Sequence, residues 1–130
     1  MSTATAAKTL KVFLADDSGP IRARVAGILS AAATIVGEGE TPVACIEGIL
    51  ASRPDVVVLD VQLEGGPGLE VLRSVRAQDP QIAFVVFSNN SGPAYRKRYL
   101  GAGASGFLDK STEFDQLPAS VDAAARTLSN

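Results

Sequence analysis

The chain has 130 residues, of which 46% are hydrophobic and 20% are charged, and its formal net charge is −2. This length and composition fit one domain with a hydrophobic core, and the net charge argues against the concentrated basic surface that binding to a nucleic-acid duplex requires. The absence of histidine excludes histidine general bases and histidine metal ligands within the chain.

The amino terminus carries no targeting signal. Residues 1–8 lack the apolar core of a secretory signal, and no apolar run in the chain approaches the ~20 residues that cross a bilayer. We therefore expect a cytoplasmic protein without membrane contact, with a flexible tail at residues 1–8 and one domain at residues 9–130. The single cysteine, Cys45, lies among apolar neighbours and is interpreted as a buried small hydrophobic residue.

Short apolar runs alternate with helical patterns along the chain. Strands are predicted at residues 11–15, 34–38, 56–59, 82–87 and 106–108. Helices are predicted from Pro20 onward and at about residues 42–52, 69–77, 93–100 and 112–128, with Pro118 opening the main part of the last helix. Residues 64–68 (EGGPG) are predicted as a loop, and the basic residues 96–98 as an ordinary helix surface. Alternation at this spacing predicts a parallel sheet with helices on both faces.

Polar side chains follow four of the predicted strands, at the points where the strands end. Asp16 and Asp17 follow the first strand, Asp60 follows the third, Ser88 the fourth, and Lys110 comes shortly after the fifth. Taken singly, an aspartate there is more often a helix cap or a turn residue, and a lysine is more often solvated. Because the carboxyl ends of parallel strands form the crevice where α/β sheets bind ligands, the convergence of all four favours a functional site.

The residue types at this edge fit phosphoryl transfer. Three adjacent carboxylates repel one another unless at least one is protonated or a cation neutralises them. Mg²⁺, with Mn²⁺ as an alternative, prefers such oxygen ligands. A carboxylate beside the ion can attack phosphorus and form an aspartyl phosphate. The ion and the ammonium of Lys110 would offset charge on the phosphoryl oxygens, and Ser88 could donate a hydrogen bond to one of them.

The motifs resemble those of the receiver domains of two-component response regulators, over about residues 11–128. The resemblance rests on LADDS after the first strand, VVVLD at the third, PGLE beyond it, Ser88, and AGASGFLDK, which ends at Lys110. It implies a flavodoxin-like α/β fold: a doubly wound, five-stranded parallel sheet of order 2-1-3-4-5 with helices on both faces. Both the stand-alone chemotaxis-type receivers and the receivers of helix-turn-helix regulators fit the sequence.

The resemblance also implies a role for each residue of the acidic edge. Asp60 would be the phosphoacceptor and a metal ligand, Asp17 would bind Mg²⁺ directly, and Asp16 would bind it mainly through water. The backbone carbonyl of Gln62 would be a further ligand.

Three residues would respond to the phosphoryl group. Ser88 would be the switch hydroxyl and Lys110 the phosphate partner. Phe107 would be the switch aromatic, although a plain core residue is an equally open interpretation.

The sequence departs from the family pattern beside the site. Glu64 stands where proline is frequent, Asn89 where a small residue is usual, and Ser111 where many members carry proline. We expect Asn89, together with Gln62 and Asn90, to set the lifetime of the aspartyl phosphate by controlling the attacking water.

The resemblance implies partners as well. The phosphoryl donor would be a cognate sensor histidine kinase, and the output would be an unidentified downstream protein, with no direct contact to nucleic acid through this domain. The contact face would be the fourth helix, fifth strand and fifth helix, including Tyr95, Tyr99 and the basic residues 96–98, and it could also support a homodimer. All five residues also fit an ordinary helix surface. The chain would be a signalling domain and not an enzyme, apart from its own phosphorylation and dephosphorylation.

Two alternative functions remain open from the sequence. The first is a degenerate receiver that binds proteins without being phosphorylated; the complete set of site residues argues against it. The second is a haloacid-dehalogenase-type phosphatase, which needs a second aspartate two residues after its nucleophile. Asp60 is followed by Val61 and Gln62, so this alternative is disfavoured.

Overall fold

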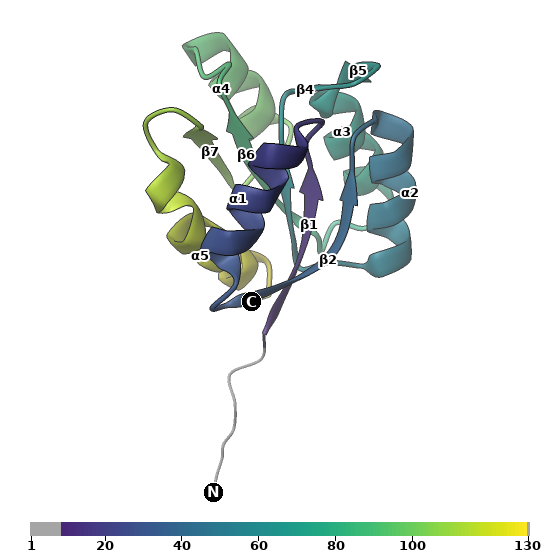
Figure 1. The fold of residues 1–130 in the computed structure, drawn as a ribbon. Helices are drawn as coiled ribbons and strands as arrows, with labels where there is room; N and C mark the ends of the chain where they lie inside the picture. Colours follow the sequence, from purple (N-terminus) through teal and green to yellow (C-terminus); the bar gives the residue numbers. More distant parts are fainter. Residues whose placement is uncertain (1–8, 130) are drawn as a thin grey trace, which may run out of the picture.

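The computed structural model describes residues 9–129, which form a parallel sheet with helices on both faces (Figure 1). The five strands of the sheet are β1 Leu10–Ala15, β2 Ala33–Gly39, β3 Val56–Leu59, β6 Ala83–Ser88 and β7 Gly106–Asp109. Their order is β2-β1-β3-β6-β7, and every neighbouring pair is parallel. This is the predicted order 2-1-3-4-5, so the predicted fold class is confirmed. The tail predicted at residues 1–8 lies outside the described residues.

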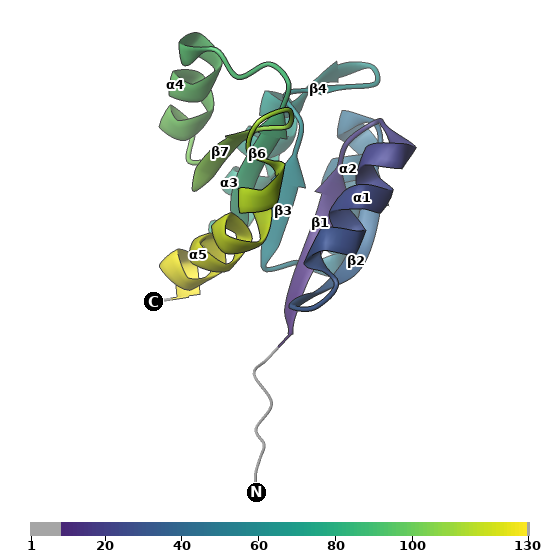
Figure 2. The ribbon, with the colours of Figure 1, turned by 60° about the vertical axis from the view of Figure 1, so that its left-hand side comes forward.

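Five α-helices cover the two faces of the sheet, as the two views in Figures 1 and 2 show. They are α1 Gly19–Leu29, α2 Pro42–Ser52, α3 Gly68–Gln78, α4 Pro93–Gly101 and α5 Leu117–Ser129. Helices α1 and α5 contribute to one hydrophobic cluster, and α2, α3 and α4 contribute to the other. No helix within residues 9–129 is long and apolar enough to cross a membrane.

The central strands are buried on both faces because their side chains alternate between the two clusters. In β1, Phe13 and Ala15 pack toward α2 and α3, whereas Val12 and Leu14 pack toward α1 and α5. Strands β3 and β6 follow the same alternation, and all of their residues are buried. A strand covered on both sides reads as an unbroken apolar run, which is the pattern that predicted these strands.

The start of α1 is fixed directly after the acidic pair that follows β1. The Ser18 side chain accepts a hydrogen bond from the backbone N–H of Ile21 at 3.3 Å, and Pro20 occupies the first turn. A serine cap followed by proline satisfies a free N–H and presets the backbone angle of the helix. The turn from strand to helix therefore holds Asp16 and Asp17 at the edge of the sheet.

Two local predictions differ from the structure. The predicted loop at residues 64–68 is a short antiparallel hairpin, in which β4 Gln62–Leu63 pairs with β5 Gly66–Pro67. Gly65 turns this hairpin with a φ of 89°, a value that favours glycine. The last helix does not begin near residue 112: a 3₁₀ turn, Phe114–Gln116, comes first, and α5 then opens at Leu117 with Pro118 in its first turn, as predicted for the main part.

Candidate functional site

The acidic cluster lies at the carboxyl edge of the sheet, where β1 and β3 end side by side (Figure 2). Asp16 and Asp17 follow β1, and Asp60 follows β3. One carboxylate oxygen from each lies within 4.8 Å of the others, a spacing that a single cation can bridge. Asp16 is buried, Asp60 is half-buried and Asp17 is exposed, so the cluster opens to solvent on the Asp17 side.

Lys110 pairs with two of these carboxylates. Its Nζ lies 2.6 Å from Oδ2 of Asp16 and 2.8 Å from Oδ2 of Asp60, and only 8% of its side chain is exposed. Burial lowers the pKa of Lys110, but the ion pairs with Asp16 and Asp60 outweigh burial and leave the pKa above its ordinary value. The ammonium therefore stays charged, and its single positive charge faces three carboxylates. A divalent cation fits the negative charge that remains.

Ser88 ends β6 and is fully buried beside the acidic cluster. Its carbonyl accepts a hydrogen bond from the backbone N–H of Lys110 at 3.1 Å, which links the end of β6 to the lysine. Its Oγ accepts the backbone N–H of Asn90 at 3.0 Å. The hydroxyl thus stabilises the loop that follows β6, and this hydrogen bond would be lost if Oγ rotated toward a ligand.

The three residues expected to tune the phosphoryl lifetime are exposed. Asn89 accepts a hydrogen bond from Oγ of Ser111 at 3.0 Å, and the Gln62 side chain donates to the carbonyl of Leu63 at 3.2 Å. Asn89 is therefore held by one of the residues that departs from the family pattern, a contact that the sequence did not indicate. The lifetime role of Gln62, Asn89 and Asn90 remains a prediction.

Phe107 lies in the core in this structure, with 6% of its surface exposed. Its ring packs edge-on against Tyr99 at a centroid distance of 6.1 Å, and the Arg96 guanidinium stands 5.1 Å from the ring centroid. The Tyr99 hydroxyl donates to the carbonyl of Val61 at 3.2 Å, one residue beyond Asp60. The aromatic pair therefore connects α4 and β7 to the end of β3.

The expectation that Tyr99 is exposed on a contact face is wrong. Tyr99 is 2% exposed because it is the one residue of α4 that is fully directed into the core, and burial raises the pKa of its hydroxyl. A buried tyrosine hydroxyl needs a hydrogen-bond partner, which the Val61 carbonyl provides. Tyr95 is exposed, as expected.

Two arginines that the sequence did not single out hold the site together. Arg22 donates to the carbonyl of Asp16 at 2.6 Å and forms ion pairs with Glu38 and Glu40. Arg96 donates to the carbonyls of Ser91 and Phe107, both at 3.0 Å, and pairs with Glu113. In the sequence both arginines have the spacing of solvent-facing helix residues, so no local signal could have found them.

A steric constraint, which the sequence spacing alone did not indicate, requires glycine at position 68. A Cβ at this position would lie 2.0 Å from the carbonyl oxygen of Asp60. The N–H of Gly68 donates to the carbonyl of Val61 at 2.8 Å, which closes the turn from β3 into α3. Only a residue without a side chain lets the helix start so close to Asp60.

Comparison with known proteins identifies the family. The family model described as the response regulator receiver domain matches residues 12–122. The chain belongs to this family. The predicted resemblance is therefore confirmed, and with it the assignment to two-component signalling. Receiver domains are signalling domains.

Individual relatives agree with the family match. The chain is 34% identical over 118 residues to the probable transcriptional regulatory protein NarL of Mycobacterium tuberculosis, an alignment covering 88% of the chain and 55% of NarL. It is 31% identical to the transcriptional activator DevR/DosR of the same organism, covering 86% of the chain and 52% of that protein. The chain thus spans about half the length of these two curated relatives.

Solved structures give the same fold. The signal receiver domain of the putative response regulator NarL from Mycobacterium tuberculosis superposes with a TM-score of 0.86 and 30% identity, over 92% of this chain and 98% of that one. A LuxR-family response regulator from Aurantimonas sp. SI85-9A1 superposes with a TM-score of 0.87 and 25% identity, over 92% and 87% of the two chains.

Proposed function

We propose that this receiver domain accepts a phosphoryl group on Asp60 from a cognate sensor histidine kinase in the cytoplasm, with Mg²⁺ (or Mn²⁺) held at the acidic cluster. The observation that carries the proposal is the ion pair of Lys110 with Asp60 and Asp16, at the one edge where three carboxylates meet. The sequence of this domain contains no histidine, so the donor imidazole is not one of its own residues. The ligands would be Asp16, Asp17, Asp60 and the backbone carbonyl of Gln62.

The transfer step uses the positions of Asp60 and Lys110. A carboxylate oxygen of Asp60 forms the bond to phosphorus while the bond from phosphorus to the kinase imidazole nitrogen breaks, and that nitrogen leaves with the electron pair. When bound, Mg²⁺ neutralises the carboxylates and offsets charge on the phosphoryl oxygens. Lys110, which pairs with Asp60 at 2.8 Å before the reaction, is within reach of a phosphoryl oxygen afterwards.

The switch would begin at Ser88. When Oγ rotates to donate its hydrogen bond to a phosphoryl oxygen, it moves away from the backbone N–H of Asn90, and the loop from Ser88 to α4 rearranges. Helix α4 is attached to this loop and to β7 through Arg96, whose partners are the carbonyls of Ser91 and Phe107. Movement of Phe107 would then change the face made by α4, β7 and α5.

That face would bind a downstream protein or a second copy of the domain. Tyr95 offers an exposed aromatic ring on it. The proposal includes no nucleic-acid contact through this domain, because the net charge is −2.

The direct test is the intact mass after incubation with acetyl phosphate, with and without Mg²⁺. The native protein should gain one phosphoryl group only with Mg²⁺, and Asp60→Asn should gain none. Asp122→Asn on the exposed surface of α5 is the matched control and should behave like the native protein. A folded native protein without an adduct would instead favour the degenerate receiver that binds its partner without phosphorylation.

The lifetime prediction has its own test. Asn89→Ala should change the dephosphorylation rate of the adduct, and Ser111→Ala should also change it because Ser111 holds the Asn89 side chain. Unchanged rates in both variants would remove Asn89 from the mechanism without affecting the assignment of Asp60.

A further inference from the structure

The basic residues 96–98 of α4 differ in the contacts that their side chains make. Arg96 is used inside the domain, where it bonds two backbone carbonyls and Glu113. Lys97 and Arg98 are exposed, and within residues 9–129 their side chains make no hydrogen bond or ion pair. The sequence pattern alone treated all three as helix surface, but the structure separates one internal anchor from two available cations.

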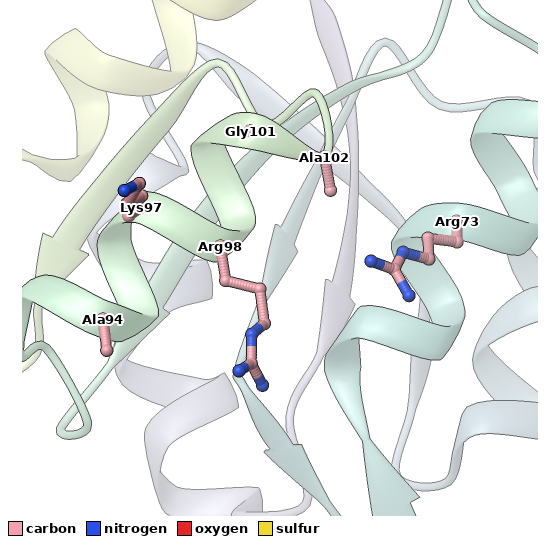
Figure 3. Close-up of a pocket in the computed structure, with 6 residues that line it drawn as sticks. All are labelled: Arg73, Ala94, Lys97, Arg98, Gly101 and Ala102. Atoms are coloured by element: carbon pink, nitrogen blue, oxygen red, sulfur yellow. The ribbon is translucent and has the colours of Figure 1, made fainter.

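These two cations line a groove that α4 shares with α3. The groove is broadly open to solvent, has a volume of about 690 Å³ and is lined by Arg73, Ala94, Lys97, Arg98, Gly101 and Ala102. Figure 3 shows Arg73 extending from α3 and Arg98 extending from α4 into the space between the two helices. Arg73 is also exposed, and like the α4 pair it makes no hydrogen bond or ion pair within the described residues.

The groove concentrates positive charge in a protein whose net charge is −2. Three of its six lining residues are cationic and none is acidic, and α4 itself contains no acidic residue. Like charges held near one another repel unless an anion lies between them. The planar guanidinium groups of two arginines suit carboxylates, which they can bind through two parallel hydrogen bonds.

The surface around the groove also offers apolar contact. Ala94, Gly101 and Ala102 form its small-residue wall, and a second hollow of about 270 Å³ next to it is lined by Ala94, Tyr95 and Arg98. Arg98 therefore lies between a cationic groove and an exposed tyrosine ring. A ligand that joins carboxylates to an apolar side chain matches both hollows.

We propose that the α3–α4 groove is a docking site for an acidic peptide segment of a partner protein, with carboxylates on Arg73 and Arg98 and an apolar side chain against Tyr95. Recognition of acidic motifs by clustered arginines is an established mode of peptide binding. A nucleic acid is a poorer match, because three cations are a small footprint and the rest of the molecule is net negative. This site lies apart from the carboxylate cluster, and the proposal concerns the unphosphorylated protein.

The test is a titration of ¹⁵N-labelled protein, followed by its backbone amide signals. The probes are peptides of about ten residues in which glutamates flank one leucine or phenylalanine at varied spacing. Amides of residues 73 and 94–102 should shift, and fluorescence anisotropy should then give the dissociation constant of the best probe. Binding should weaken as salt is raised, because the contacts are exposed charges.

Two double variants make the result specific. Arg73→Gln with Arg98→Gln should weaken binding by about tenfold or more. Arg24→Gln with Arg126→Gln changes the net charge by the same amount, on the other face of the sheet, and should leave the affinity within about twofold. Thermal unfolding of both variants verifies that they are folded.

Three outcomes would overturn the proposal. The first is that no peptide of the set shifts groove amides at millimolar concentration. The second is that the two double variants weaken binding equally, which would indicate a general charge effect. The third is that a single-stranded oligonucleotide shifts the same amides at lower concentration than any peptide, which would make the groove a nucleic-acid site.

Discussion

Replacing Lys110 by methionine should destabilise the domain strongly when divalent cations are absent. The side chain is 8% exposed and pairs with Asp16 at 2.6 Å and with Asp60 at 2.8 Å, so methionine keeps the apolar stem but leaves these carboxylates facing each other and Asp17. Removing one partner of a buried ion pair costs about 3–5 kcal/mol. Because Asp17 opens the cluster to solvent, we expect the lower end, about 3 kcal/mol, which corresponds to a melting temperature lower by about 12 °C.

The assay is urea unfolding of native protein, Lys110→Met and Lys97→Met, each in a chelating buffer and in excess Mg²⁺. Lys97 is an exposed lysine, so its variant should stay within about 0.5 kcal/mol of the native protein. Mg²⁺ should recover at least half of the loss in Lys110→Met, because the ion takes over the neutralising role of the ammonium. If Lys110→Met is as stable as Lys97→Met in the chelating buffer, the carboxylates do not need the lysine and the electrostatic account of the site is wrong.

Three further outcomes follow from the packing around the site. Gly68→Ala should lower the unfolding free energy by about 3 kcal/mol, because its Cβ would lie 2.0 Å from a backbone carbonyl oxygen. Gly27→Ala, on the open side of α1, should not destabilise the domain, and urea unfolding compares the two variants. Tyr99→Phe should cost about 1–2 kcal/mol by leaving a carbonyl without its donor, and Tyr95→Phe, on the surface, should cost none in the same assay. Burial raises the pKa of the Cys45 thiol to about 12 from an ordinary value of 9.0, so the folded state holds the proton more tightly than the unfolded state. Stability should be full below pH 9 and fall above it by up to about 1.4 kcal/mol per pH unit. Because tyrosine and lysine titrate in both proteins, the Cys45→Ala variant should show a shallower slope than the native protein between pH 9 and 10.

The sequence predicted the sheet and the acidic cluster because both depend on local patterns in chain order. An unbroken, β-branched apolar run such as Val56–Leu59 is typical of a strand buried on both faces, and residues that follow such parallel strands converge at one edge of the sheet. The resemblance added the roles of Asp60, Ser88 and Lys110. In the structure, Lys110 contacts Asp60 through its side chain and the Ser88 carbonyl through its backbone N–H.

What the sequence could not predict depends on contacts between distant segments. Tyr99 bonds the Val61 carbonyl across 38 positions, and Arg22 reaches the Asp16 carbonyl from a helix face that reads as solvent-facing. The hairpin at residues 62–67 lacks the alternating apolar strands by which a longer hairpin is predicted, so its turn residues indicated only a loop. The division of residues 96–98 into an internal arginine and two groove cations likewise becomes visible only when α3 and β7 are in place.

The attachment of α4 has a consequence for the motions of the domain. This helix buries only Tyr99 in full, and two side chains, Tyr99 and Arg96, hold it to neighbouring carbonyls. A helix with so few apolar contacts opens at a lower free energy than the central strands, so its amide protons should exchange with solvent long before those of β1, β3 and β6. The helix that follows the loop after Ser88 and borders the basic groove is thus an element that opens more easily than the central strands.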